Sequence, residues 1–158
     1  KMSQTQVQRP FIADKEKLMS TRWKVNASFT SGTGSEHMSG GWNQVYSVGD
    51  AMTVSSGTFT FPFTGLFKVT LVFVGGSSQA SAYRGGDIRF TTNNSDYTAQ
   101  HSGYTHTGAS QYWSLGTLEA IVDVTDTSNC KVRIHAENAA TGTISSQTSV
   151  MFEYLGDT

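Results

Sequence analysis

The segment TNNSDYTAQHSGYTHTGASQYW, residues 92–113, holds the densest group of side chains that could bind a ligand. Tyrosine and tryptophan present broad amphipathic faces that suit sugar rings, and histidine adds a polar contact. A long segment without a sustained apolar face is typical of a functional loop, although short strands can lie within it. We predict that carbohydrate binds to Tyr97, His101, Tyr104, His106, Tyr112 and Trp113. The alternative is that these side chains pack the loop onto its own domain or onto a neighbouring subunit.

Metal binding is a second chemistry that the histidines could support. His101 and His106 lie five residues apart and His37 is distant in the sequence, a spacing that matches no standard zinc pattern. The turn TNNSD could offer oxygen ligands to calcium, but it lacks the Gly and Glu positions of an EF-hand loop. The sequence therefore predicts no metal site and no cofactor.

Hydrolase chemistry needs a nucleophile held by a base, and the chain contains no Gly-x-Ser-x-Gly elbow or similar local motif. Serine, histidine and aspartate are common along the chain, so a triad assembled only in three dimensions stays open as an alternative. We expect a protein that is not an enzyme.

The composition is typical of many short strands joined by polar loops. The 158 residues include 16 glycines and only 15% charged residues, and a chain of this length normally forms one domain. A formal net charge of −1 argues against a nucleic-acid partner, which would bind a clustered basic surface. No apolar run is long enough to span a bilayer, so we expect no membrane insertion. Cys130 is the single cysteine, so packing or assembly must hold the fold without an intrachain disulfide.

Alternation of apolar and polar residues predicts about eight strands separated by turn signals. They lie at residues 22–29, 42–49, 57–62, 66–74, 87–92, 118–124, 130–136 and 149–156. This pattern favours an all-β fold, a two-sheet antiparallel jelly-roll sandwich. If residues 125–129 form a hairpin loop, Asp123 lies opposite Lys131 and Glu119 opposite His135, which are favourable cross-strand pairs.

Two of these strands, at 66–74 and 149–156, carry apolar residues on both faces. A strand buried on one side only would alternate more cleanly, so we expect both faces to be covered, one by the opposite sheet. The sequence does not say which face meets which neighbour. We predict that the core or a subunit interface contains Phe67, Leu71, Phe73, Val150, Phe152 and Tyr154.

The stretch GTFTFPFTGLFKVTLVF, residues 57–73, resembles the characteristic segment of C1q/TNF-like domains, in which a Pro- and Gly-bearing turn leads into a long central strand. The match is carried by Gly57, Phe59, Pro62, Gly65, Leu66 and Phe67. The order of the remaining strands is also similar, from about residue 23 to residue 155. Such domains typically form homotrimers with one sheet of each subunit facing the threefold axis, so the resemblance implies a trimer. The polar loops and the lack of disulfides are more similar to the C1q-like modules of phage and bacterial surface proteins.

We therefore expect an N-terminal arm or tether at residues 1–22 and a C1q/TNF-like jelly-roll domain at residues 23–158. The expected function is a non-enzymatic homotrimeric structural or attachment module of a virus particle, of the phage head-decoration or fibre type. Its expected partners are its own copies, virion proteins bound through the arm, and cell-surface carbohydrate, and its expected location is the virion. The alternative is a secreted, extracellular C1q-like lectin or ligand-recognition domain of a cellular organism.

Overall fold

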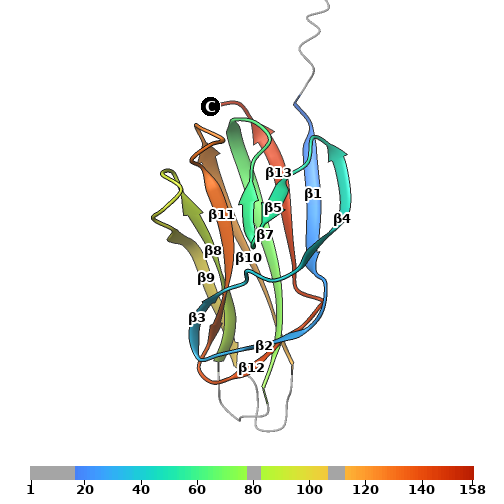
Figure 1. Cartoon of the computed structure of the whole chain (residues 1–158), viewed down its shortest axis with the longest axis vertical. Coiled ribbons are helices and arrows are strands. Elements are labelled where there is room, and N and C mark those ends of the chain that lie inside the picture. The colour runs from blue at the N-terminus through green and yellow to red at the C-terminus, as the bar shows by residue number, and fades with distance from the viewer. Residues whose placement is uncertain (1–16, 78–82, 107–112) are drawn as a thin grey trace, which may run out of the picture.

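The structure is a computed structural model that describes residues 17–77, 83–106 and 113–158. Within these ranges the chain forms thirteen β-strands and no helix, in two antiparallel sheets packed face to face (Figure 1). No helix that could cross a membrane is present in the described ranges. The predicted all-β jelly-roll sandwich is confirmed.

The thirteen strands divide between the two sheets as follows. The first sheet contains β1 (Met19–Val25), β2 (Phe29–Ser31), β4 (Trp42–Gly49), β7 (Gly65–Gly76), β10 (Ser114–Val124), β12 (Gly142–Ile144) and β13 (Ser149–Gly156). The second sheet contains β3 (Gly34–His37), β5 (Thr53–Ser55), β6 (Thr58–Thr60), β8 (Tyr83–Thr91), β9 (Thr98–His106) and β11 (Lys131–Asn138).

Strand β7 organises the first sheet. It pairs with β10 along one edge and with β13 and β12 along the other, and β13 pairs in turn with β1, which pairs with β4. The C-terminal strand thus lies centrally, as its two apolar faces predicted. In the second sheet, β11 pairs with β8 on one side and with β6 and β3 on the other, and β9 follows β8.

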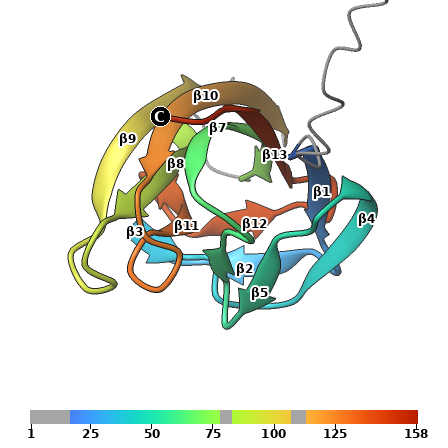
Figure 2. The ribbon, with the colours of Figure 1, turned by 90° about the horizontal axis from the view of Figure 1, so that it is seen from above.

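The core lies between the two sheets, and Figure 2 shows the strands arranged around this common interior. Phe67, Leu71 and Phe73 of β7 point inward and are at most 1% exposed, as are Val150 and Phe152 of β13. Tyr154 is partly buried against the same core. These six residues, predicted for the core or a subunit interface, therefore belong to the core. Any interface on this sheet must use the opposite faces of the same strands.

The turn at residues 61–65 shows why the chain needs proline and glycine before β7. Pro62 follows β6 and cannot donate a ladder hydrogen bond. Gly65 has a φ of 136°, and a Cβ there would lie 2.7 Å from both the Gly156 carbonyl oxygen and the Tyr154 ring. Phe63 packs edge-on against Tyr154, with ring centroids 5.0 Å apart. The turn therefore joins the start of β7 closely to the end of β13.

The predicted hairpin between residues 118–124 and 130–136 is wrong. Strand β10 belongs to the first sheet and β11 to the second, so the connection between them crosses from one sheet to the other. Both strands point their apolar faces into the common core, from opposite sheets. The register places Asp123 opposite Leu66, Glu119 opposite Thr70, Lys131 opposite Thr91, and His135 opposite Asp87.

Other strand boundaries also differ from the sequence prediction. Strand β3 lies in a segment predicted as a Gly-bracketed loop, and β9 lies in the long aromatic segment, because both are polar edge elements without an apolar alternation. The predicted strand at 22–29 is interrupted at residues 26–28, between β1 and β2. Strand β1 begins at Met19, before the predicted domain boundary at residue 23.

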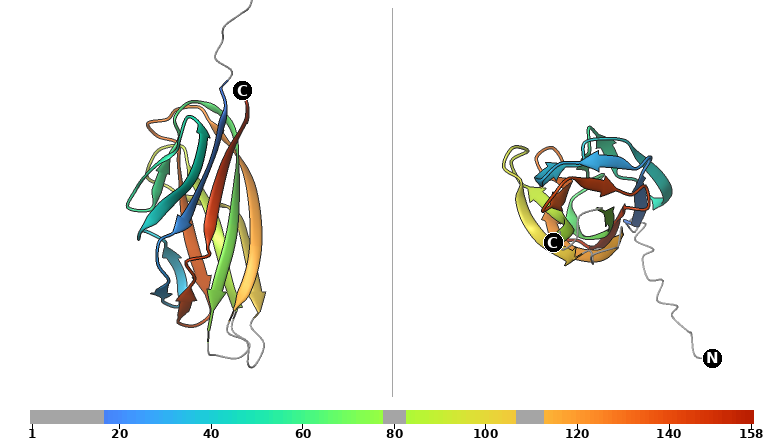
Figure 3. Two further views of the ribbon diagram at one scale, coloured as in Figure 1. Left: turned by 90° about the vertical axis from the view of Figure 1, so that its right-hand side faces the viewer. Right: turned by 90° about the horizontal axis from the view of Figure 1, so that it is seen from below.

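Both ends of the described chain lie at the same end of the sandwich (Figures 1 and 3). Lys17 and Asp157 form an ion pair there. The short strand β12 and the end of β7 lie at the opposite end. The two ends of the described chain therefore meet at one end of the sandwich.

Candidate functional site

The six residues predicted to bind a ligand do not form a single site. Tyr112 lies outside the described residues. The other five are spread over the length of β9 and the residue before β10. They are Tyr97, His101, Tyr104, His106 and Trp113.

Tyr97 and His101 make contacts that hold the fold together. Tyr97 is half-buried, and the Arg133 guanidinium carbon lies 3.9 Å from the centre of its ring. His101 Nδ1 lies 2.7 Å from the carbonyl oxygen of Glu119. Because His101 is on β9 and Glu119 on β10, this hydrogen bond links the edge strands of the two sheets. These contacts favour the packing alternative for both residues.

Tyr104, His106 and Trp113 remain available to a ligand. Tyr104 is 55% exposed on the outer face of the second sheet, and its ring packs edge-on against Tyr83 at 5.1 Å. His106 is exposed and lies opposite Tyr83 in the β8–β9 register. Trp113 is also 55% exposed, but it lies far along the sandwich from Tyr97, next to the end of β7. Ligand binding by these three residues stays a prediction.

Trp113 lines a pocket of about 400 Å³ at the end of the sandwich away from the chain termini, which we name the end pocket. Its other described walls are formed by the end of β7 and by the chain around β12, including Ser77, Thr141 and Thr143. The lining therefore combines one aromatic ring with hydroxyl groups and glycine backbone.

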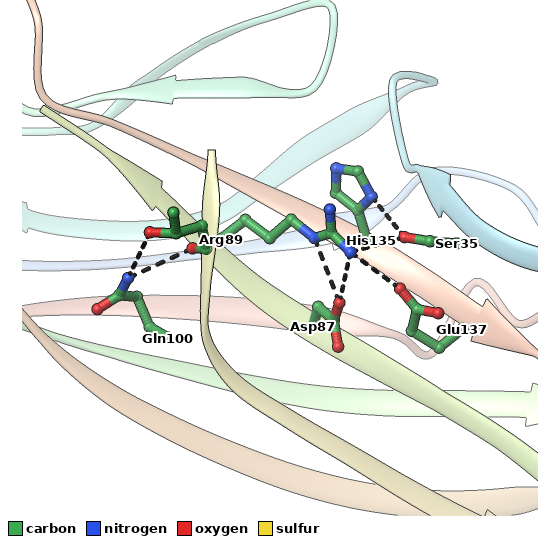
Figure 4. Close-up of polar contacts among 7 residues, drawn as sticks. Ser35, Asp87, Arg89, Gln100, His135 and Glu137 are labelled. Carbon is green, nitrogen blue, oxygen red and sulfur yellow. Dashed lines mark hydrogen bonds and ion pairs between the residues drawn. The ribbon is translucent and has the colours of Figure 1, made fainter. Parts of the chain in front are cut away.

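A polar cluster that the sequence did not reveal lies on the outer face of the second sheet. We name it the Arg89 cluster; it consists of Ser35, Asp87, Arg89, His135 and Glu137 (Figure 4). Arg89 Nη2 donates to Asp87 Oδ2 at 2.9 Å and to Glu137 Oε1 at 3.2 Å, and Arg89 Nε donates to Asp87 Oδ2 at 3.2 Å. Asp87 is only 2% exposed and Glu137 8%, so one guanidinium serves two buried carboxyl groups.

The two carboxyl groups of this cluster ionise differently. Burial raises the pKa of Glu137, and the nearby Asp87 carboxylate raises it further. Burial also opposes ionisation of Asp87, but the Ser102 hydroxyl and the Arg89 guanidinium stabilise its charged form and lower its pKa. Asp87 therefore carries the negative charge that pairs with Arg89, and Glu137 keeps its proton to a higher pH.

Two histidines lie beside the cluster. The rings of His37 and His135 stack with their centres 5.3 Å apart. Burial and the nearby Arg89 charge lower the pKa of His135 to about 4, and burial also lowers the pKa of His37. Both rings are therefore neutral at pH 7. His37 and Ser35 lie on β3, so these contacts attach that short edge strand to β11.

Ser35 and His135 resemble two members of a catalytic triad but are poorly arranged for catalysis. Ser35 Oγ lies 3.0 Å from His135 Nδ1, but it also accepts a hydrogen bond of 2.9 Å from Arg89 Nη2. A histidine with a pKa of about 4 is a weak general base at neutral pH. The contacts of Ser35 therefore stabilise β3 and do not prepare a nucleophile.

The described ranges contain no group of three or more His, Cys, Asp or Glu residues that could hold a metal ion. The turn TNNSD is closed by its own hydrogen bonds. Asn93 Oδ1 accepts from the backbone N–H groups of Ser95 at 3.0 Å and Asp96 at 2.9 Å, and Asn93 Nδ2 donates to Asp96 Oδ2 at 2.7 Å. These contacts are those of an Asx turn.

The sequence analysis missed the Arg89 cluster because its members come from three strands whose pairing is not local. Asp87, Arg89 and His135 alternate with apolar residues, a pattern typical of the solvent-facing side of a strand. The available signal was the acidic and basic content of both strands on one face, but only the observed β8–β11 register brings those faces together.

Comparisons with known proteins agree with this architecture. No protein-family model matches the chain, and no curated protein matches its sequence. Among solved structures, murine APRIL is 8% identical and superposes with a TM-score of 0.66 over 88% of this chain and 100% of that one. The Eiger TNF of S. frugiperda is 11% identical, with a TM-score of 0.65 over 90% of this chain and 95% of that one. At these identities the comparisons show the fold alone: the chain has a TNF-like jelly-roll fold.

Proposed function

We propose that this protein is a non-enzymatic homotrimeric structural or attachment module of a virus particle, of the head-decoration or fibre type. The observation that supports it most strongly is an apolar outer face on the first sheet, which we name the assembly face. Its exposed or half-buried apolar side chains come from β10, β7 and β13, which are neighbours, and from β4, which is separated from β13 by β1. They are Tyr46, Val48, Leu66, Val72, Val74, Leu115, Ile121, Met151 and Leu155.

The exposure of this face is unusual for a single subunit in water. Leu115 is 63% exposed, Ile121 62% and Leu155 51%, and they share the face with the half-buried Val72 and Val74. Contiguous apolar patches of this kind mark association surfaces. The two-faced strands that the sequence predicted are thus covered on one side by the second sheet, and we infer that other copies of the chain cover the other side.

The polar residues at the centre of the assembly face are compatible with burial. Lys68 Nζ and Glu153 Oε2 form an ion pair of 2.8 Å. The Thr70 hydroxyl donates to Glu119 Oε1 at 3.2 Å. Because these charges are already partnered within one subunit, association does not leave them alone in a dry interface.

The position of the chain ends supports an attachment role. The described chain starts at one end of the sandwich, so the residues that precede β1 can act as an arm that fixes that end to other virion proteins. The opposite end then faces outward, as do the polar outer faces of the three second sheets. Three weak sites on one rigid trimer bind a multivalent surface with gained avidity.

The assembly face is tested with single substitutions. Ile121→Asp and Leu115→Asp each place a charge on this face, and both should convert a trimer to a monomer in sedimentation velocity. The matched control is Tyr104→Asp, at a similarly exposed position on the second sheet, which should stay trimeric. A trimer that tolerates both first-sheet substitutions would contradict the assignment of this face.

The virion location needs a separate test. Mass spectrometry of purified particles released by cells that carry the gene should detect this chain in a fixed ratio to the other particle proteins. Its recovery only in a secreted fraction free of particles would contradict the virion proposal and favour the extracellular lectin alternative.

A further inference from the structure

The end pocket lies beside a buried arginine that has no acidic partner. Arg84 of β8 points into the interior of the sandwich and is 0% exposed. It takes part in no ion pair with any described residue. Residues 78–82 and 107–112, which the structure does not describe, contain no Asp or Glu. Because an isolated charge is costly to bury, an unpaired guanidinium at this depth needs an explanation.

The hydrogen bonds of Arg84 satisfy it only in part. Nη1 donates to the Tyr83 carbonyl at 2.7 Å and Nη2 to the Thr141 carbonyl at 3.3 Å. Its Nε is buried and has no partner in the described structure. Asn138, directly opposite Arg84 in the β8–β11 register, also has a buried oxygen without a hydrogen-bond partner there. The interior at this end of the sandwich is therefore polar and incompletely satisfied.

The chain at residues 141–142 both lines the end pocket and lies close to the guanidinium. Thr141 and Gly142 line the pocket, and Thr141 also accepts the hydrogen bond from Arg84. A Cβ on Gly142 would lie 2.6 Å from Arg84 Nε and 3.0 Å from Nη2. Glycine at position 142 thus permits the guanidinium to approach the chain that lines the pocket. The positive charge of Arg84 then acts on a ligand in the pocket across protein, which screens charge less than water does.

We propose that the end pocket binds a carboxylate-bearing sugar, of the uronic or sialic acid kind. The carboxylate compensates the buried Arg84 charge, the exposed Trp113 ring stacks on the sugar, and Ser77, Thr141 and Thr143 contact its hydroxyl groups. This inference deepens the proposed attachment function and rests on it for the outward position of the pocket. An acidic glycan on a host surface is the partner class that this chemistry recognises.

The test uses D-glucuronate as the probe, added to the full chain labelled with ¹⁵N, with the indole N–H signals followed by NMR. Glucuronate should shift the Trp113 signal saturably, and D-glucose, which lacks the carboxylate, should bind at least about tenfold more weakly. Inorganic phosphate should bind more weakly than glucuronate, because it carries negative charge but has no sugar ring to stack on Trp113. Equal binding of glucose or of phosphate would overturn the proposal.

Two substitutions assign the binding to this pocket. Trp113→Ala changes an exposed side chain and should weaken glucuronate binding at least about tenfold, whereas Leu18→Ala, a change at a similarly exposed apolar side chain at the other end of the sandwich, should not. Arg84→Met removes the charge while filling its volume, a change that buried charged sites often tolerate, and should weaken binding similarly. Arg84→Lys should restore part of it.

A folded Arg84→Met protein that binds glucuronate as tightly as the wild type would overturn the proposal. The guanidinium would then serve only to donate hydrogen bonds to the Tyr83 and Thr141 carbonyl groups. The result is independent of assembly. A monomer that binds glucuronate would contradict the proposed trimer and keep the pocket, whereas a trimer that shows no binding would contradict the pocket alone.

Discussion

Three oxygens from three strands lie within 3.2 Å of one nitrogen, Arg89 Nη2. They belong to Asp87 on β8, Glu137 on β11 and Ser35 on β3. The guanidinium therefore links three strands through its side-chain hydrogen bonds, in addition to the backbone pairing between them. The two carboxyl groups beside it are not equivalent, and this difference can be measured.

Substitution of each carboxyl group by its amide separates the two roles. Glu137→Gln keeps an acceptor for Arg89 and removes repulsion from Asp87, so we expect it to change the free energy of unfolding by less than about 1 kcal/mol. Asp87→Asn removes the charged acceptor of two Arg89 hydrogen bonds and should cost about 2–4 kcal/mol. Urea denaturation at pH 7 measures both. Equal losses for the two variants would contradict the assignment of the charge to Asp87.

His135 should make the fold sensitive to acid. Its pKa is lowered to about 4 in the folded protein, chiefly by burial, whereas a histidine in the unfolded chain titrates near 6.5. Between these pH values the unfolded chain binds the proton and the folded protein does not, so stability falls as the pH drops from about 6.5 to 4. Because the ring is only half-buried, solvent screening reduces this loss to about 1–2 kcal/mol.

The variant His135→Gln should lose this contribution. The difference in unfolding free energy between pH 7 and pH 4.5 should be smaller than in the wild type, as measured by urea denaturation at both values. His106→Gln, a change at an exposed histidine on β9, is the control and should behave like the wild type. An unchanged pH dependence in His135→Gln would show that this ring does not titrate as described.

Among the connections between strands, the turn at residues 61–65 requires a glycine at position 65. Gly65→Ala forces a positive φ on a residue with a Cβ and brings that atom within 2.7 Å of the Gly156 carbonyl. The backbone strain and the clash together should cost about 2–4 kcal/mol of stability. Thermal unfolding followed by circular dichroism measures the loss, with Gly40→Ala, an open position of ordinary φ, as the control. A variant as stable as the control would contradict the role of this turn.

The strands show which parts of the fold could be predicted from the sequence. The inward faces of β7, β10, β11 and β13 follow from alternation, because burial of each second residue is a local pattern. Pairing is not local. Complementary charges on β10 and β11 predicted a hairpin, yet those strands lie in different sheets and contribute to the core from opposite sides. Charge patterns alone do not distinguish neighbours in a sheet from partners across it.

The candidate site was less predictable for the same reason. Aromatic residues close in sequence, such as Tyr97 and Trp113, lie far apart because the extended β9 separates them. Arg84 carries no sequence signal of its burial, since its charge predicts an exposed position, and only the tertiary structure places it beside the end pocket. The central Pro- and Gly-bearing segment was informative because its turn geometry depends on residues adjacent in sequence.

At the scale of the whole molecule, the two outer faces have different chemistry. The first sheet presents the assembly face with its central Lys68–Glu153 ion pair, and the second presents the Arg89 cluster and the exposed Tyr104. In the proposed trimer, each subunit buries its assembly face against its copies and keeps the other face in solvent. The described chain ends then lie at one end of each subunit, and the end pocket lies at the other.

The proposed trimer is tested most directly by the solution mass of the full chain, measured by multi-angle light scattering at several concentrations. We expect a stable species of about three times the chain mass of 17.1 kDa, unaffected by dilution through the micromolar range. A mass of one chain at all concentrations would contradict it, because the apolar outer face of the first sheet would then have no partner among copies of this protein.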